Sequence, residues 1–197
     1  MERLTLEQTQ DAVPERANLR KLLLATFFSV LTCVSASIVV PIPYVPITMQ
    51  SFVVLMAGLL LGARYGAVSQ ALYLLLGLLG LPVFAGGKGG LHHILSPSFG
   101  FLVGFIPAAF TAGYLVPKGP APWWRFSLAC FAATAVLYAV GLPLFWLNMN
   151  FVTAPQAGMT FVRTMKLAFV PFILPDSLKA LLAGLLAAKT QAVLKSR

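Results

Sequence analysis

Six apolar stretches, each close to the length needed to cross a lipid bilayer, dominate this chain of 197 residues. A helix that crosses the hydrocarbon layer needs about 20 mainly apolar residues, with a range of about 17–25. Prolines or basic residues follow most of these stretches, as expected where a helix leaves the membrane. The expected spans are residues 19–40, 48–63, 65–81, 99–116, 126–147 and 175–193.

The composition agrees with a membrane protein and excludes a soluble domain. Hydrophobic residues make up 59% of the chain and charged residues 10%, whereas soluble domains carry about 25% charged residues. We therefore predict an all-α integral membrane protein in which six transmembrane helices form a compact bundle. Residues 1–18 are expected to form a polar N-terminal tail, itself a frayed or surface helix, and residues 19–197 a single membrane domain.

The basic residues predict how the chain crosses the membrane, because cytoplasmic loops carry an excess of lysine and arginine. With a cytoplasmic N-terminus, ten basic residues fall on the inner side: Arg3, Arg16, Arg20, Lys21, Arg64, Lys118, Arg125, Lys189, Lys195 and Arg197. Three fall on the outer side: Lys88, Arg163 and Lys166. The prediction is an N-in/C-in, multi-pass protein of the cytoplasmic membrane, with residues 41–47, 82–98 and 148–174 outside. Binding residues concentrate in such loops, so a substrate pocket is expected near the extracellular face.

Several functional classes are disfavoured by the residues present. The basic residues form no stripe with interleaved aromatics, which argues against a nucleic-acid partner. Paired aspartates, GxSG and HExxH are absent from the sequence, so no enzyme activity is expected. His92 and His93 would diverge by about 100° on a helix, which does not suit a shared metal, and no cofactor is expected. Cys33 and Cys130 are interpreted as small buried residues.

The expected outer loops contain several candidate binding groups. In GGKGG, residues 86–90, glycine amides can converge on an anion beside Lys88, although a flexible hairpin explains the motif equally well. The stretch PIPYVPITMQS places Tyr44 and Gln50 among apolar groups, a mixture that suits either a pocket wall or a plain connection. Asn148 begins the longest loop, which is long enough to cover a site. Within it, FVRTMKLAFVPF is typical of an amphipathic helix at the membrane interface.

Asp176 is the only acidic residue after Glu15, and Lys179 follows it at the start of the apolar stretch ALLAGLLAA. Residues i and i+3 of a helix share a face, so the two can form an ion pair. Ionisable residues inside a membrane are costly and usually mark a site. Because the expected topology places Asp176 at the outer mouth of the last span, the pair is predicted to face a polar solute.

Small residues recur at helical spacing along four of the expected spans, where they allow close packing of helices. They include Ala25, Ser29 and Cys33, Gly58 and Gly62, Gly100 and Gly104, and Ala180, Gly184 and Ala188. Packing inside the bundle explains most of them. The ridge on the first span can also face a partner membrane protein, and the sequence leaves both interpretations open.

Three stretches of the chain together resemble one family: PITMQSFVVLMAGLLLGARYGAVSQALYLLLGLLGLPVFAGGKGG, PSFGFLVGF and LPDSLKALLA. They resemble the BioY family, the biotin-binding, substrate-capturing S components of energy-coupling factor (ECF) transporters. The likeness covers the chain from about Leu19 to the C-terminus. It implies a six-helix membrane protein that captures biotin on the outer side for uptake. The implied partners are a transmembrane coupling protein, a pair of cytoplasmic ABC ATPases and membrane lipid.

The resemblance also assigns residues. The family's functional Asp and Lys of the last helix match Asp176 and Lys179, and its glycine-rich loop matches Gly86, Gly87 and Gly89 around Lys88. The small residues of the first helix, which dock the coupling protein in the family, match Ala25, Ser29 and Cys33.

For biotin as the ligand, we expect Asp176 to accept hydrogen bonds from the ureido N–H groups, while Lys179 or Lys88 neutralises the carboxylate. The opposite arrangement, with Lys179 on the ureido oxygen and Asp176 orienting it, is also open. Apolar walls are expected from Tyr44, Phe52, Tyr73 and Phe84. Two other classes stay possible: a stand-alone vitamin transporter or facilitator that needs no ATPase, and a non-transporting membrane scaffold.

Overall fold

Helices form nearly all the regular structure in this computed structural model, which describes residues 2–117, 119 and 121–195, with the backbone alone for residues 2–17, 157 and 192–195. The long helices are α1 (Glu2–Ser35), α2 (Gln50–Leu78), α3 (Phe99–Leu115), α4 (Trp123–Asn148) and α6 (Ile173–Lys195). The connections hold the strands β1 (Val39–Val40) and β2 (Ile47–Thr48) and the short helices η1 (Leu91–Leu95), η2 (Met149–Thr153), η3 (Pro155–Ala157), α5 (Phe161–Ala168) and η4 (Val170–Phe172). The predicted all-α class is confirmed, as is a helix at α5.

Four segments of the described chain are long and apolar enough to cross a membrane: Asn18–Ser35, Gln50–Leu78, Trp123–Thr153 and Phe161–Gln191. The apolar helix α3 is shorter. Together these segments indicate a multi-pass membrane protein. The number differs from the six predicted spans in part because α2 covers two of them, residues 48–63 and 65–81.

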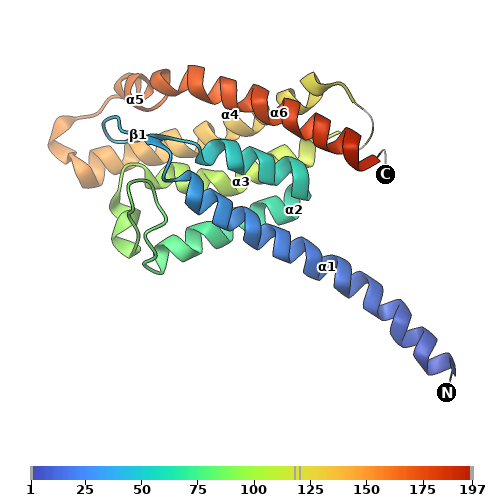
Figure 1. Cartoon of the computed structure of the whole chain (residues 1–197). Helices are drawn as coiled ribbons and strands as arrows, with labels where there is room; N and C mark the ends of the chain where they lie inside the picture. Colours follow the sequence, from blue (N-terminus) through green and yellow to red (C-terminus); the bar gives the residue numbers. More distant parts are fainter. Residues whose placement is uncertain (1, 118, 120, 196–197) are drawn as a thin grey trace.

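The backbone of α2 leaves the helical conformation at Gly62, with φ 79° and ψ 175°. This region of φ and ψ is essentially restricted to glycine. A Cβ on Gly66 would lie 2.8 Å from the Cα of Gly58, whereas residues eight apart in a straight helix are separated by about 12 Å. The two halves of α2 therefore fold back on each other, as Figure 1 shows. The predicted interruption at Arg64 lies close to this turn.

Three connections gather at one end of the bundle (Figure 1). They comprise residues 36–49, 79–98 and 149–172, and we call this end the loop end. The C-terminal part of α6 and the turn within α2 lie at the other end. The three loops predicted to lie outside thus share one end of the molecule.

The first of these connections is a short hairpin, in which Val39 pairs with Thr48 and Val40 with Ile47. Helix α1 ends at Ser35, before the predicted boundary at Val40, because β-branched residues 38–40 favour an extended backbone. At its other end, residues 2–18 continue α1 as helix, and Met1 lies outside the described residues. The helix expected in this segment is confirmed, while a domain boundary at residue 18 stays a prediction.

Small residues bring the helices close together. A Cβ on Gly58 would lie 2.3 Å from the backbone oxygen of Ala109 in α3, and a Cβ on Gly184 would lie 2.5 Å from the backbone nitrogen of Ser127 in α4. Gly104 packs against Leu137 in the same way. Packing inside the bundle is therefore confirmed for these glycines.

The ridge of small residues on α1 also faces the bundle. Ala25 and Ser29 are buried, with exposed fractions of 0% and 1%, and Cys33 packs against the buried core. Helix α1 packs on α2, where Thr32 and Gln70 lie within 3.4 Å of each other. In this chain Ala25, Ser29 and Cys33 therefore pack against the protein's own helices, and docking of a coupling protein at these residues stays a prediction.

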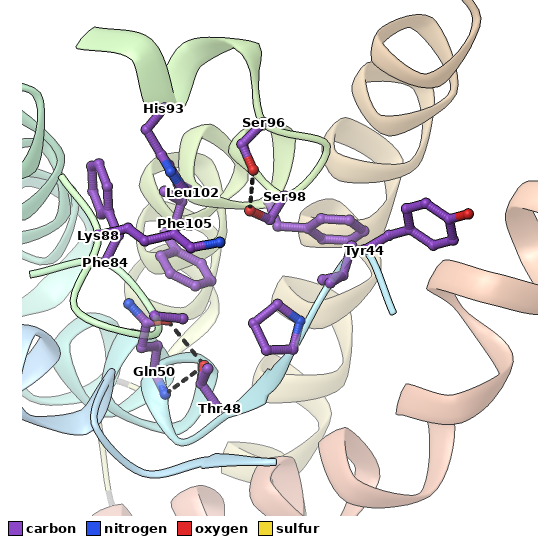
Figure 2. A pocket seen from close by; sticks show the side chains of 14 residues that line it. Tyr44, Thr48, Gln50, Phe84, Lys88, His93, Ser96, Ser98, Leu102 and Phe105 are labelled. Carbon is purple, nitrogen blue, oxygen red and sulfur yellow. Dashed lines mark hydrogen bonds between the residues drawn. The ribbon is translucent and has the colours of Figure 1, made fainter. Parts of the chain in front are cut away.

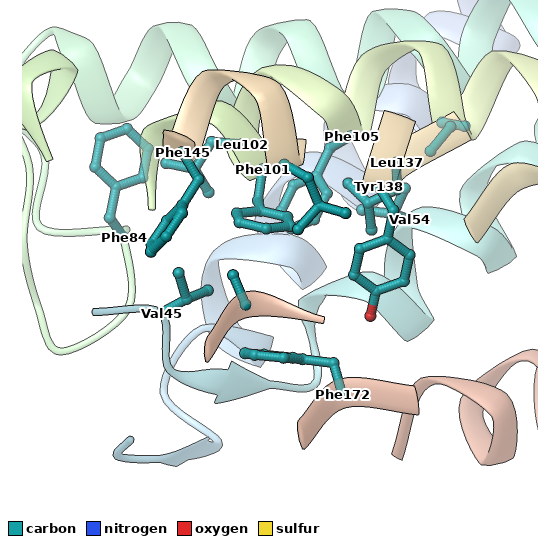
Figure 3. Close-up of a cluster of buried hydrophobic side chains, with 14 of the residues drawn as sticks. Val45, Val54, Phe84, Phe101, Leu102, Phe105, Leu137, Tyr138, Phe145 and Phe172 are labelled. Atoms are coloured by element: carbon teal, nitrogen blue, oxygen red, sulfur yellow. The ribbon is translucent and has the colours of Figure 1, made fainter. Parts of the chain in front are cut away.

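Two hydrophobic clusters divide the interior by side-chain size. The cluster nearer the loop end is rich in aromatic rings. Figure 3 shows five of its members: Phe84, Phe101, Phe105, Phe145 and Phe172. The second cluster contains mainly alanines, including Ala129, Ala133, Ala180, Ala183 and Ala187. Alanines allow helices to pack closely, whereas large rings hold them apart. The space for a ligand therefore lies among the aromatic rings.

Candidate functional site

Asp176 and Lys179, near the start of α6, form a buried ion pair, with 2.7 Å between Lys179 Nζ and Asp176 Oδ1. The Lys179 ammonium also donates to the carbonyl oxygen of Thr48 at 2.8 Å and to Ser51 Oγ at 3.0 Å. Asp176 accepts hydrogen bonds from Ser51 Oγ at 3.1 Å and from the Tyr138 hydroxyl. Residues from β2, α2, α4 and α6 thus converge on one polar cluster, and the predicted ion pair is confirmed.

The two charged groups of this cluster differ in how many further hydrogen bonds they can make. An ammonium has three N–H donors, and those of Lys179 are directed at Asp176, Ser51 and Thr48. A carboxylate has about two acceptor positions on each oxygen. Within the described side chains, Asp176 Oδ1 accepts two hydrogen bonds and Oδ2 accepts one. Asp176 can therefore accept a further hydrogen bond, whereas Lys179 can bind a ligand only by giving up a bond it already makes.

Two adjoining cavities lie beside this cluster, with volumes of about 50 and 90 Å³. They share five lining residues: Val45, Pro46, Thr48, Phe101 and Phe105. The smaller cavity is also lined by Ser51, Leu137, Tyr138, Phe172, Asp176 and Lys179. The larger one is also lined by Tyr44, Gln50, Phe84, Ala85, Lys88, His93, Ser96, Ser98 and Leu102. The arrangement suits an elongated small molecule with a polar group at each end and an apolar middle.

Gln50 supplies a fixed polar group to the larger cavity (Figure 2). Its side chain is buried, and its Oε1 accepts a hydrogen bond from the Thr48 hydroxyl at 3.0 Å. Its Nε2 donates to the hydroxyl of Tyr73, which in turn donates to the carbonyl oxygen of Val83 at 3.3 Å. Tyr73 therefore holds the Gln50 side chain in place from outside the cavity lining. The sequence had instead predicted that Tyr73 forms part of the apolar wall.

The glycine-rich loop forms a tight turn between Phe84 and Lys88, which pair as an antiparallel bridge. Gly86 and Gly87 have positive φ values of 77° and 70°, which explains the glycines. The amides of Gly87 and Lys88 both donate to the carbonyl oxygen of Phe84. These two amides are thus used within the hairpin, and it is the side chain of Lys88 that extends into the cavity (Figure 2).

His93 also lines the larger cavity, a position that the sequence did not indicate. Its ring stacks on Phe84, with 4.6 Å between the ring centroids, and it is 5% exposed. Burial, together with the nearby Lys88 and His92, lowers the pKa of His93 to about 4. The imidazole is therefore neutral near pH 7 and adds no charge beside Lys88.

Three other predicted residues lie away from the cavity linings. Phe52 packs against the alanine-rich cluster. Asn148 donates to the carbonyl oxygen of Leu95 at 2.9 Å and accepts a hydrogen bond from Thr153 at 2.7 Å, so it ties two loops together. Gly89 packs closely against the backbone of Leu81.

Tyr138 and Phe172 line the smaller cavity, and they are the candidate site residues that sequence reasoning missed most clearly. Tyr138 is a hydroxyl-bearing residue in the middle of an apolar span, which was a usable signal. Phe172 lies in an apolar stretch without any distinguishing pattern. Among the side chains that the structure describes, no group of three His, Cys, Asp or Glu is placed to hold a metal ion.

Comparison with known proteins decides the family, because the model of the BioY family matches residues 8–196. This chain belongs to the BioY family. The resemblance found in the sequence is confirmed, and the match begins earlier than the predicted start near Leu19.

Curated BioY proteins are similar over most of their length. The chain is 36% identical to the "Probable biotin transporter BioY" of Lysinibacillus sphaericus, over 89% of this chain and 88% of that protein. It is 37% identical to the "Biotin transporter BioY" of Thermotoga maritima, over 86% of this chain and 94% of that protein.

A solved structure, described as the S-component for biotin from an ECF-type ABC transporter, superposes with a TM-score of 0.75. The superposition covers 90% of this chain and 93% of that one, at 23% sequence identity. The BioY chain therefore shares the fold of that S component.

Proposed function

We propose that this protein captures biotin as the S component of an ECF transporter and takes part in its uptake. The observation that carries the proposal is the buried Asp176–Lys179 pair, which borders an apolar cavity that continues toward Lys88. The BioY relatives are named as biotin transporters, which supports the same ligand.

The chemistry of biotin fits the two ends of this site. Its ureido ring has two N–H donors and one acceptor, and its chain ends in a carboxylate. We propose that Asp176 Oδ2 accepts a ureido N–H, because it has acceptor capacity left. Lys88 then faces the carboxylate, because the N–H donors of Lys179 are already engaged. The rings of Phe101 and Phe105 line both cavities and would contact the apolar middle of biotin.

We further propose that the chain crosses the cytoplasmic membrane six times, N-in and C-in, with residues 19–197 as one domain. The fold-back of α2 at Gly62 supports six spans, since it supplies two antiparallel helical segments. The excess of basic residues in the proposed inner loops supports the orientation. The loop end then faces outward, so biotin enters from outside.

The proposed partners are a transmembrane coupling protein and a pair of cytoplasmic ABC ATPases. The chain has no Walker A sequence, so ATP hydrolysis would be supplied by other subunits. Uptake that proceeds without any ATPase subunit would instead favour the stand-alone facilitator.

Calorimetry of the detergent-solubilised protein with biotin tests the proposed function. We expect saturable binding by the wild-type chain. Asp176→Asn should weaken it by about tenfold or more, since a hydrogen bond to a charged group contributes about 1.5–3 kcal/mol. Lys179→Ala should weaken it to a similar extent, because it releases the Asp176 carboxylate from its orientation. Lys166→Ala, which removes an exposed lysine outside both cavities, is the control. Absence of heat at micromolar biotin would overturn the proposal, and wild-type affinity in both site variants would overturn the site.

A further inference from the structure

A groove at the end of the bundle away from the loops has no role in the proposed function. It lies between α1 and the part of α2 that follows the turn at Gly62, and its volume is about 450 Å³. Its lining residues are Asn18, Leu19, Leu22, Arg64, Tyr65 and Val68.

One part of this groove is polar and cationic. The Tyr65 hydroxyl donates to Asn18 Oδ1 at 3.1 Å, which joins the two helices. Lys21 Nζ lies 5.7 Å from the centroid of the Tyr65 ring, within the range of a cation–π interaction. Arg64 lines the groove with an exposed side chain. One basic side chain thus lies over the Tyr65 ring, and a second one lines the same groove.

The rest of the groove is apolar. Leu19 and Leu22 are 57% and 46% exposed, and Val68 lines the groove from α2. Lys21 lies where the apolar part of α1 begins, and Arg64 lies just after the turn between two apolar segments. Basic residues at these positions are expected to be level with the lipid headgroups. In the proposed orientation, Leu22 and Val68 follow Lys21 and Arg64 along their helices toward the membrane interior, where acyl chains lie.

We propose that this groove binds a phospholipid with a net negative headgroup. The phosphodiester lies between Lys21 and Arg64, whose guanidinium can donate two parallel hydrogen bonds to phosphate oxygens. An acyl chain lies along Leu19, Leu22 and Val68. Basic pockets between transmembrane helices on the cytoplasmic side are suited to anionic headgroups. The apolar lining selects a lipid over a free anion, which would leave these side chains uncovered.

Native mass spectrometry of the detergent-solubilised full chain tests this proposal with phosphatidylglycerol and phosphatidylcholine as probes. We expect phosphatidylglycerol to bind at least about fivefold more tightly than phosphatidylcholine. The double variant Lys21→Gln, Arg64→Gln should lower the affinity for phosphatidylglycerol about thirtyfold, because each basic residue at a membrane surface contributes about 1 kcal/mol. Binding of phosphatidylcholine should fall less, because its choline cation offsets the charge of its phosphate.

The matched control is Arg125→Gln, Lys189→Gln, which removes the same charge from exposed residues outside the groove. Leu22→Trp fills the apolar part and should weaken the binding of both lipids. Unfolding temperatures measured without lipid identify any variant that fails to fold. Leu22→Trp tests the apolar part of the groove, and the charge variants test its cationic part.

Several outcomes would overturn the inference. These are equal binding of the two lipids, an equal loss in the control variant, and displacement of phosphatidylglycerol by millimolar inorganic phosphate. Retained lipid binding in the groove variant, together with loss of a co-expressed membrane partner, would show that the groove docks a protein instead.

Discussion

At the scale of single residues, the site combines one carboxylate that retains acceptor capacity with one lysine whose donors are occupied. A buried ion pair is tolerated only when its remaining hydrogen-bonding groups are satisfied. Thr48, Ser51 and Tyr138 meet that condition around Asp176 and Lys179. We therefore interpret Lys179 as the group that holds the Asp176 carboxylate in its orientation, and Lys88 as the cation available to a ligand.

This assignment predicts that the contribution of the biotin carboxylate to binding affinity requires Lys88. Wild-type protein should bind biotin more tightly than biotinamide, by about three- to tenfold because Lys88 is exposed and its charge is screened. In Lys88→Gln the two ligands should bind almost equally. Competition binding with both ligands measures the difference. A preference for biotin that persists in Lys88→Gln and disappears in Lys179→Gln would show that the lysines have the opposite roles.

His93 predicts a pH dependence of stability. Its pKa in the folded protein is about 4, against an ordinary value of 6.5. Between these values the unfolded chain binds a proton that the folded chain does not, so the free energy of unfolding falls as the pH drops from about 6.5 to about 4. Above that window the contribution of His93 is fully present.

Thermal unfolding in detergent at several pH values measures this effect. The decline between pH 6.5 and 4 should be smaller in His93→Gln than in wild type. His92→Gln removes an exposed neighbour that contributes least to the low pKa of His93, so its profile should stay closer to wild type than that of His93→Gln. Identical profiles for wild type and His93→Gln would contradict the prediction.

At the scale of elements, glycines decide where helices turn and how closely they approach. Gly62 allows α2 to reverse direction, and Gly58 allows α2 to touch α3. The aromatic cluster then holds the loop end open, while the alanines close the other end. The position of the cavities follows from this distribution of side-chain size.

Gly62→Ala should therefore destabilise the protein by about 2 kcal/mol, because its backbone conformation is strained for any residue with a Cβ. For a chain of this size, the loss corresponds to roughly 4–8 °C in unfolding temperature. Gly119→Ala is the control, since a Cβ there meets no described atom within 4 Å. Equal unfolding temperatures for the two variants would show that the turn is not strained.

At the scale of the whole molecule, the three loops lie at one end of the bundle, and the end of α6 lies at the other (Figure 1). In the proposed N-in/C-in topology, these two ends face different compartments. The groove lined by Arg64 and the binding site beside Lys88 are then separated by the bilayer, which fits capture on one side and contact with lipid or partners on the other.

Cysteine labelling tests the proposed orientation. In a background with Cys33→Ala and Cys130→Ala, we expect a membrane-impermeant maleimide to label Leu91→Cys in intact cells. Thr190→Cys should react only after the membrane has been opened. Both positions are exposed in the structure. The reverse pattern would contradict an N-in/C-in topology.

The sequence by itself determined the class of protein, its family and the charged pair at the centre of the site. These properties depend on local patterns: apolar stretches of spanning length, an Asp and a Lys at i and i+3, and motifs in a fixed order. Lys88, Gln50, Tyr44 and Phe84 were also predicted, and they line one cavity.

Only the tertiary structure decided which side chains meet across the bundle. Tyr138 reaches Asp176 from α4, His93 stacks on Phe84, and Tyr73 lies behind Gln50. It also showed that the ridge of Ala25 and Ser29 faces inward. A helical pattern gives the spacing of small residues along one helix, but the face they present depends on where the neighbouring helices pack.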